Sequence, residues 1–146
     1  MGPPDWSAGP SAESLPPATA IINPKNIDDD FPYKNIAAVG VTFFFLIAVR
    51  GALRENNWFV NNGITEPDLM QFLDLVALGT VCDVMPLTMI NRVFVKQGIK
   101  FMEKRSNLGL SALNDMLNIG DNIHSYHLGY IIGPRINAGG RVNESS

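Results

Sequence analysis

The sequence contains one cysteine, Cys82, among 146 residues. A single cysteine excludes a disulfide within the chain and any zinc site built from several cysteine ligands. It is compatible with a reducing cytoplasm, where we expect the protein to be located. Positive charge is also scarce, since 11 Lys and Arg stand against 14 Asp and Glu, for a net charge of −3. Binding to nucleic acid would therefore need a local site rather than a basic surface.

The sequence also lacks a long apolar run. The longest, residues 36–49, is shorter than the roughly 20 residues that a membrane helix needs and ends at Arg50. We therefore expect a buried helix there and no contact with a membrane. The N-terminus has neither the basic nor the apolar region of a signal peptide. Hydrophobic residues make up 46% of the chain, which excludes disorder throughout and favours one domain or a piece of one.

Proline is concentrated in residues 1–17, which hold five of the ten prolines and are predicted to be a disordered tail or leader. Residues 18–23 form a short β-branched apolar run closed by Pro24, which predicts a strand. A lone strand leaves its backbone groups unpaired. We therefore expect this segment to lie at an exposed edge and to allow self-association with a second copy.

The remainder of residues 18–146 is predicted to be mostly helical. The first helix starts with Asn35 as N-cap, and a near capping box at residues 65–68 precedes the second. Further helices are predicted at residues 69–77, 90–104, 110–118 and 125–132. Gly133 and Pro134 are expected to end the last helix, so that a glycine loop follows.

Asp83 is a single carboxylate within the apolar stretch LVALGTVCDVMPL at residues 75–87. An unpaired buried carboxylate costs several kcal/mol or shifts its pKa, so it needs a cation, a metal or several hydrogen-bond donors. Two interpretations stay open at this point. Asp83 either caps the end of a helix before Met85 and Pro86, or it is a ligand of a hard metal ion held against an apolar wall.

The stretch GPRINAGGR at residues 133–141 combines two arginines and an asparagine with paired glycines. Glycine lets the backbone approach a ligand closely, and arginine binds phosphate through a bidentate fork. The stretch is too short for a Walker loop, and its glycine spacing does not match a dinucleotide loop. It is either a phosphate-binding loop or a glycine turn with solvated arginines.

Other candidate residues have simpler interpretations. His124 and His127 could share a metal, but no carboxylate pattern accompanies them, which favours surface histidines. Residues 28–30 are all aspartates without the spacing of a calcium loop. Residues 43–45 are consecutive phenylalanines and point three ways around a helix, which favours core packing over base stacking. Cys82 is better explained as an inert core residue than as a nucleophile.

Several stretches together resemble the RecJ family of single-strand-specific DNA exonucleases, within the DHH phosphoesterase superfamily. The resemblance runs from about Ser14 to Val142, includes the pair Asn91-Arg92, and is most specific in the order and separation of the aspartate and glycine-arginine stretches. Its main segments are AIINPK (20–25), AAVGVTFFF (37–45), FLDLVALGTVCDVMPL (72–87) and LGYIIGPRINAGGRV (128–142).

The resemblance implies a DHH domain, an α/β fold in which helices flank a parallel sheet. It also implies a two-lobed enzyme of DNA repair and recombination that removes nucleotides from the 5′ end of single-stranded DNA with manganese or magnesium. Asp83 matches a metal-ligand aspartate, while Arg135, Asn137 and Arg141 match a loop near the scissile phosphate. The chemistry agrees, because hard cations prefer oxygen ligands and arginine offsets charge on phosphate.

The family's earlier motifs, including the paired Asp-His-His, and its second lobe do not occur in this sequence. Cys82 and Gly139 also stand where alanine is usual. We therefore expect a central, mainly helical fragment with one short strand, inactive by itself because one carboxylate cannot hold two metals. Two alternatives stay open: a non-catalytic DHH-type scaffold or binding module in a replication complex, or a DHH phosphoesterase acting on oligonucleotides or pyrophosphate. The retained Asp83 favours an enzyme.

Overall fold

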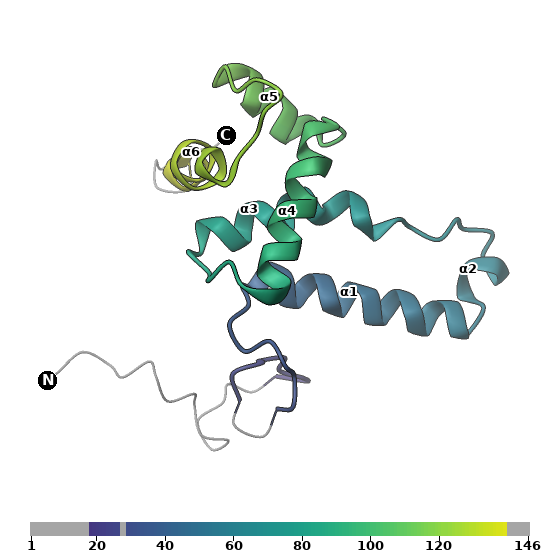
Figure 1. The fold of residues 1–146 in the computed structure, drawn as a ribbon. Coiled ribbons are helices and arrows are strands. Elements are labelled where there is room, and N and C mark those ends of the chain that lie inside the picture. The colour runs from purple at the N-terminus through teal and green to yellow at the C-terminus, as the bar shows by residue number, and fades with distance from the viewer. Residues whose placement is uncertain (1–17, 27–28, 140–146) are drawn as a thin grey trace, which may run out of the picture.

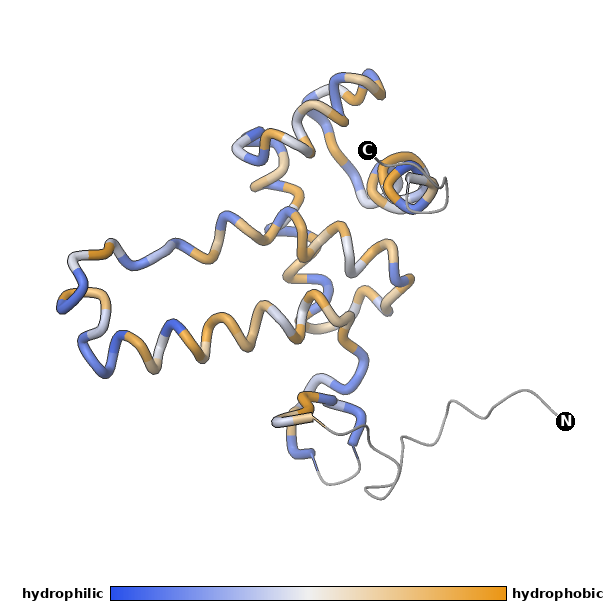
Figure 2. Tube along the Cα trace, turned by 180° about the vertical axis from the view of Figure 1, so that it is seen from behind, coloured by the Kyte–Doolittle hydropathy of each residue, from blue (hydrophilic) through white to orange (hydrophobic). Residues whose placement is uncertain are grey.

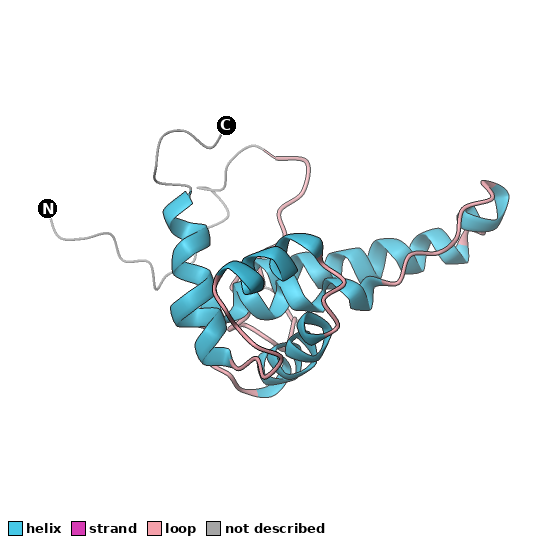
Figure 3. Ribbon diagram, turned by 90° about the horizontal axis from the view of Figure 1, so that it is seen from above, coloured by secondary structure: helices cyan, strands magenta, loops and turns pink. Residues whose placement is uncertain are grey.

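The computed structural model describes residues 18–26 and 29–139, and the predicted tail at residues 1–17 lies outside that range. Helices dominate the described chain, and no strand occurs in it, as Figures 1 and 3 show. None of these helices is both long and apolar enough to cross a bilayer. In chain order the elements are α1 (Ala38–Glu55), α2 (Trp58–Asn61), the 3-10 helix η2 (Leu69–Phe72), α3 (Leu73–Cys82), α4 (Met89–Glu103), α5 (Leu108–Met116), the π-helical segment η3 (His127–Ile132) and α6 (Gly133–Gly139).

Helix α3 lies at the centre of the fold because its sequence is apolar on nearly every side. It packs along α4, and Gly98 of α4 makes the close approach possible. A Cβ atom at Gly98 would lie 2.1 Å from the carbonyl oxygen of Leu73 and 2.4 Å from the Cβ of Ala77. No side chain fits at that distance, so the crossing of α3 and α4 depends on glycine.

Two hydrophobic clusters surround α3 and meet on it. The first joins α3 to α4, α5 and η3 through Ala77, Leu78, Val95, Met102, Leu110, Ile119, Ile123, Leu128 and Ile132. The second joins α3 to α1 and α4 through Ile36, Phe43, Leu69, Leu73, Val76 and Phe94. The rings of Phe43 and Phe94 meet edge to face, with centroids 5.7 Å apart. The prediction of core packing is thus confirmed for Phe43, whereas Phe45 is 48% exposed.

The second half of α1, α2 and the returning segment form an arm that projects from the body (Figures 1 and 3). Figure 2 shows a hydrophobic stretch along α1, which remains partly uncovered in the described chain. Nε of Arg54 donates to Oε2 of Glu66 at 2.9 Å and ties the two sides of the arm together. The predicted capping box at residues 65–68 is wrong in detail, because Glu66 binds arginine and Asp68 caps the next turn through the amide of Met70.

The start of α1 also differs from the prediction. The helix begins at Ala38, with Ala37 as N-cap, and Asn35 lies outside it. The buried Asn91 of α4 explains the difference, because its Nδ2 donates to the carbonyl oxygen of Asn35 at 2.7 Å. The same Nδ2 donates to the carbonyl oxygen of Pro86 at 3.0 Å. Asn91 therefore holds the segment before α1 against the loop that follows α3.

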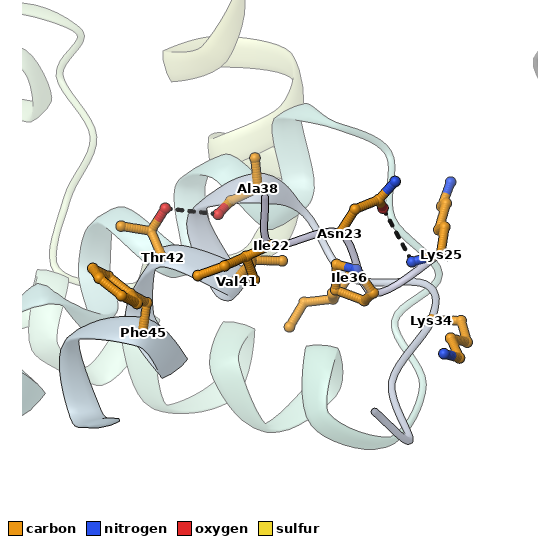
Figure 4. Close-up of a pocket in the computed structure, with 10 residues that line it drawn as sticks. Ile22, Asn23, Lys25, Lys34, Ile36, Ala38, Val41, Thr42 and Phe45 are labelled. Carbon is orange, nitrogen blue, oxygen red and sulfur yellow. Dashed lines mark hydrogen bonds between the residues drawn. The ribbon is translucent and has the colours of Figure 1, made fainter. Parts of the chain in front are cut away.

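The predicted strand at residues 18–23 does not form. The segment runs in irregular structure, with Ile21 39% and Ile22 58% exposed. A strand needs a neighbouring strand to bond its backbone, and the described residues provide none. A cavity of about 400 Å³ separates this segment from the first turns of α1, with Ile22, Val41 and Phe45 on its walls (Figure 4). Pairing of the segment with a second copy stays a prediction.

Candidate functional site

Asp83 occupies the C-terminal end of α3, where its amide donates to the carbonyl oxygen of Gly79 at 2.9 Å. Its side chain is exposed, so the expectation of a buried carboxylate in an apolar setting is wrong. Val76, Ala77 and Leu78 of α3 are buried in the core, whereas Cys82 and Asp83 at the end of the helix are exposed. Asp83 is therefore accessible to a ligand.

The turn after Asp83 is fixed by two backbone hydrogen bonds. The amide of Val84 donates to the carbonyl of Val81 at 3.0 Å, and the amide of Met85 donates to that of Thr80 at 3.1 Å. This pairing is a Schellman motif, in which the residue after the helix takes a left-handed conformation, usually as glycine. Here it is Val84, with φ of 54°. A β-branched residue is strained there, and the strain lies directly beside Asp83.

The stretch at residues 133–139 is helical, which corrects the predicted glycine loop. The chain is helical from Ser125, passes through the π-helical segment η3, and continues as α6 to Gly139. Gly133 and Pro134 do not end the helix. A proline ring normally collides with the carbonyl four residues earlier, and the wider turn of a π-helix moves that carbonyl aside. Arg135 and Asn137 are thus carried on a helix.

A cavity of about 610 Å³ brings Asp83 and Asn137 together. Its walls are the end of α3 on one side and the η3–α6 helix on the other. The remaining lining residues are Leu75, Leu78, Gly79, Cys82, Gly129, Gly133, Pro134 and Ile136. Asp83 is the one ionisable carboxylate among them. The cavity thus places a carboxylate and an amide on a mostly apolar surface, as in sites where a few polar groups orient a ligand.

Close packing of Gly133 on Cys82 sets the distance between the two walls. A Cβ atom at Gly133 would lie 2.5 Å from Sγ of Cys82 and 2.9 Å from the carbonyl oxygen of Leu128. The Cys82 thiol lies 3.8 Å from that same carbonyl, a weak hydrogen bond. Burial and the negative charge of Asp83 raise the pKa of the Cys82 thiol. A raised pKa disfavours the nucleophilic thiolate. The prediction of a core position is wrong, because Cys82 is exposed at the end of α3.

Curated proteins similar to this chain share one description, although no protein-family model matches the sequence. The chain is 43% identical over 136 residues to the single-stranded-DNA-specific exonuclease RecJ of Dickeya dadantii and 42% identical over 136 residues to that of Escherichia coli. Each match covers 92% of this chain and 24% of the relative. RecJ of Bacillus subtilis is 32% identical over 133 residues, 90% of this chain and 15% of the relative.

The chain belongs to the RecJ family. It spans about a quarter of the length of the first two relatives. The resemblance drawn from the sequence motifs is therefore confirmed, together with a mainly helical composition for this part of a RecJ protein.

The four residues that the RecJ resemblance assigned to the site have different positions. Asp83 and Asn137 share the cavity. Arg135 does not line it, because its Nη1 donates to the carbonyl oxygen of Ile131 at 2.7 Å on the outside of the helix. Arg141 lies outside the described residues. The roles of these four residues stay predictions.

The histidines of this RecJ segment have a structural role in the described chain. The backbone amide of His124 donates to Nδ1 of His127 at 2.9 Å, and the two rings stack with centroids 5.8 Å apart. This bond caps the first turn of the helix, as a glutamate does in a capping box. No group of three or more potential metal ligands occurs anywhere in the described ranges. One carboxylate, Asp83, does not make a complete site for a metal ion.

The buried carboxylate of this segment is Asp74, which the sequence analysis missed. Asp74 is 1% exposed, and its Oδ1 accepts from the amide of Leu75 at 2.6 Å, whereas Oδ2 has no hydrogen-bond partner. Burial raises the pKa of Asp74, against the opposing effects of the Leu75 amide and the side chain of Asn107. The sequence does indicate that Asp74 is buried, because the apolar residues Ala77, Leu78 and Val81 follow it at helical spacing and so lie on the same face of the helix.

Proposed function

We propose that the protein to which this chain belongs removes nucleotides from the 5′ end of single-stranded DNA with manganese or magnesium, in DNA repair and recombination. The observation that supports it best is the cavity that contains both Asp83 and Asn137, which come from the two stretches most specific to the resemblance. The similar proteins are named single-stranded-DNA-specific exonucleases. We further propose a DHH-type α/β fold for the whole protein and a cytoplasmic location.

In this proposal Asp83 contributes one oxygen ligand to a metal ion. Its carboxylate is exposed at a helix end whose backbone is fixed by the Schellman motif, so it can meet a cation without rearrangement. The further ligands must come from outside the described residues, because no cluster of ligands forms within them. The chain alone is therefore expected to release no nucleotides, whatever metal is added.

Asn137 and the two arginines are proposed to bind the phosphate. The amide of Asn137 can donate to a non-bridging oxygen inside the cavity, while Arg135 and Arg141 offset the charge that grows on the phosphate during hydrolysis. Arg135 must leave the carbonyl of Ile131 to do so. Its exposed position leaves the side chain free to turn.

A segment exchange tests this proposal without knowledge of the rest of the protein. The matching 136 residues of the Escherichia coli exonuclease are replaced by those of this chain, and release of nucleotides from single-stranded DNA is measured against manganese concentration. We expect the chimera to be active. Asp83→Ala should abolish activity or raise the manganese concentration needed for half-maximal rate.

Arg141→Ala should fail in another way, with kcat lowered about 100- to 1000-fold and the manganese dependence unchanged. Asp121→Ala and Lys96→Ala are controls, since both residues are exposed, lie off the cavity and stand outside the segments that carry the resemblance. Melting temperatures of all variants separate a lost site from lost folding. If a folded chimera binds single-stranded DNA without cleaving it, the segment belongs to a binding module, and the proposal is wrong.

A further inference from the structure

Two exposed tyrosines form a stacked pair on the helix that leads into α6. The rings of Tyr126 and Tyr130 lie with centroids 5.2 Å apart and planes inclined by 24°. Tyr126 is 60% and Tyr130 74% exposed. Their rings therefore contribute little to the core of the described chain, although aromatic rings dominate the packing where they are buried.

The tyrosine pair forms one wall of a second cavity, of about 440 Å³. The opposite wall is the segment that follows Asp83, where Val84 is 86% and Leu87 42% exposed. The other lining residues are Val81, Cys82, Met85, Ser125 and Gly129. Among the described residues that line this cavity there is no acid, lysine or arginine. Its volume lies within the range of about 300–1,000 Å³ that is usual for ligand sites.

The second cavity adjoins the one that contains Asp83 and Asn137. Cys82 and Gly129 line both, so the two spaces are separated only by the contact between α3 and η3. A ligand that extends across this contact meets uncharged aromatic and aliphatic groups on one side. On the other side it meets a carboxylate and an amide. This division suits a nucleotide, whose base is flat and uncharged and whose phosphate needs polar partners.

We propose that Tyr126 and Tyr130 form a stacking subsite for a base of single-stranded DNA, next to the site at Asp83; this inference rests on the proposed function. Aromatic rings bind unpaired bases through their faces and tolerate any sequence, because every base has a π-face. A single strand exposes those faces, whereas a duplex buries them in its own stack. The subsite thus selects single strands by the accessibility of their bases.

Binding of a fluorescein-labelled oligothymidylate to this chain, followed by anisotropy in EDTA, tests the subsite without cleavage. The double variant Tyr126→Leu/Tyr130→Leu should raise Kd about 5- to 150-fold, the loss expected for a stacked base. The variant Tyr126→Phe/Tyr130→Phe should bind within about twofold of the unaltered chain, because it keeps both ring faces. Trp58→Leu removes a 40% exposed aromatic residue from the distant arm and should leave Kd unchanged.

An abasic oligonucleotide of equal length and charge shows whether the bases are what the tyrosines contact. The unaltered chain should bind it more weakly than oligothymidylate, and this preference should disappear in the leucine variant. A leucine variant that keeps the preference, or an unaltered chain that has none, overturns the proposal. Helix content by circular dichroism shows that the variants are folded, and the phenylalanine variant provides a second folded reference.

The outcomes also separate this inference from the proposed function. If the chimera cleaves single-stranded DNA in an Asp83-dependent manner while the leucine variant binds as tightly as the unaltered chain, the exonuclease proposal stands and the stacking subsite is wrong. If the chimera cleaves nothing but the tyrosines govern binding of base-bearing strands, the subsite stands and the hydrolytic function is wrong. If the unaltered chain binds no oligothymidylate, the subsite is wrong.

Discussion

The contact between Gly133 and Cys82 gives a prediction whose magnitude follows from the structure. Gly133→Ala places a Cβ atom 2.5 Å from Sγ of Cys82. Relaxed contacts of this kind need about 3.5–4.0 Å, so α6 must move by roughly 1 Å from α3. Overpacking of this kind costs about 1–3 kcal/mol, and the better helix propensity of alanine returns about 1 kcal/mol. We expect a net loss of about 0–2 kcal/mol in the free energy of unfolding.

The Cys82→Ala background makes this test specific. Without Sγ the nearest atom of residue 82 is its Cβ, 3.8 Å from the new methyl group, which is an ordinary contact. Gly133→Ala should then cost about 1–2 kcal/mol less than it does beside Cys82, a coupling energy that urea denaturation followed by circular dichroism can measure. Gly51→Ala is the matched control. No atom lies within 4 Å of its Cβ position, so it should not couple to Cys82.

A coupling energy below about 0.5 kcal/mol would refute the reasoning, because it would mean that residues 82 and 133 are not in contact in solution. The Cys82→Ala change alone should cost little, since Cys82 is already exposed on one side. The carbonyl oxygen of Leu128, 2.9 Å from the same Cβ position, remains in both backgrounds. This contact with the carbonyl oxygen should still lower the free energy of unfolding of the double variant Cys82→Ala/Gly133→Ala.

Three further predictions concern stability. The pKa of Asp74 is raised in the folded state, so its contribution to stability is full below the ordinary value of 3.8 and is lost as pH rises through the folded pKa. As pH rises from 3.8 through the folded pKa, the free energy of unfolding of Asp74→Asn should therefore increase relative to that of the unaltered chain in urea titrations. A difference that does not change with pH would contradict this. Gly98→Ala should cost about 3 kcal/mol or more, because its Cβ meets a backbone carbonyl that cannot turn aside; an unchanged thermal midpoint would exclude the contact. Val84→Gly should raise the thermal midpoint, because it removes about 1–2 kcal/mol of left-handed strain and only an exposed side chain; a lower midpoint would show that no strain is stored there.

The sequence predicted the helices well where a periodic apolar pattern decides the structure. Residues 90–104 form α4 almost to the residue, and the segment at 110–118 overlaps α5. The apolar pattern did not predict the structure where a residue bonds to a partner that is distant in sequence. Asn35 accepts a bond from Asn91 instead of capping a helix, and Glu66 pairs with arginine across the arm. Neither partner is local in sequence.

The roles predicted for the candidate site residues stay predictions, and the geometry around them differs from the expectation. Asp83 and Asn137 line one cavity, whereas Arg135 does not. The burial expected at Asp83 belongs instead to Asp74, because both aspartates follow apolar residues and only the helix end distinguishes them. Glycine and proline at residues 133 and 134 indicated a loop because both residues disfavour a regular α-helix. Their propensities do not predict the preceding π-helical turn, which lets the helix continue.

The π-helical segment makes chain length, rather than side-chain chemistry, the property that aligns the two walls of the cavity. Each residue of an α-helix turns the chain by about 100°. A π-helical turn contains one more residue than an α-helical turn. If His127–Ile132 became regular α-helix with all six residues kept, Asn137 would therefore rotate by roughly that angle, away from Asp83. A RecJ-family chimera joined within this segment must keep the six residues as a π-helix, or lose one residue together with the π-helical turn, even where the residues themselves can be exchanged.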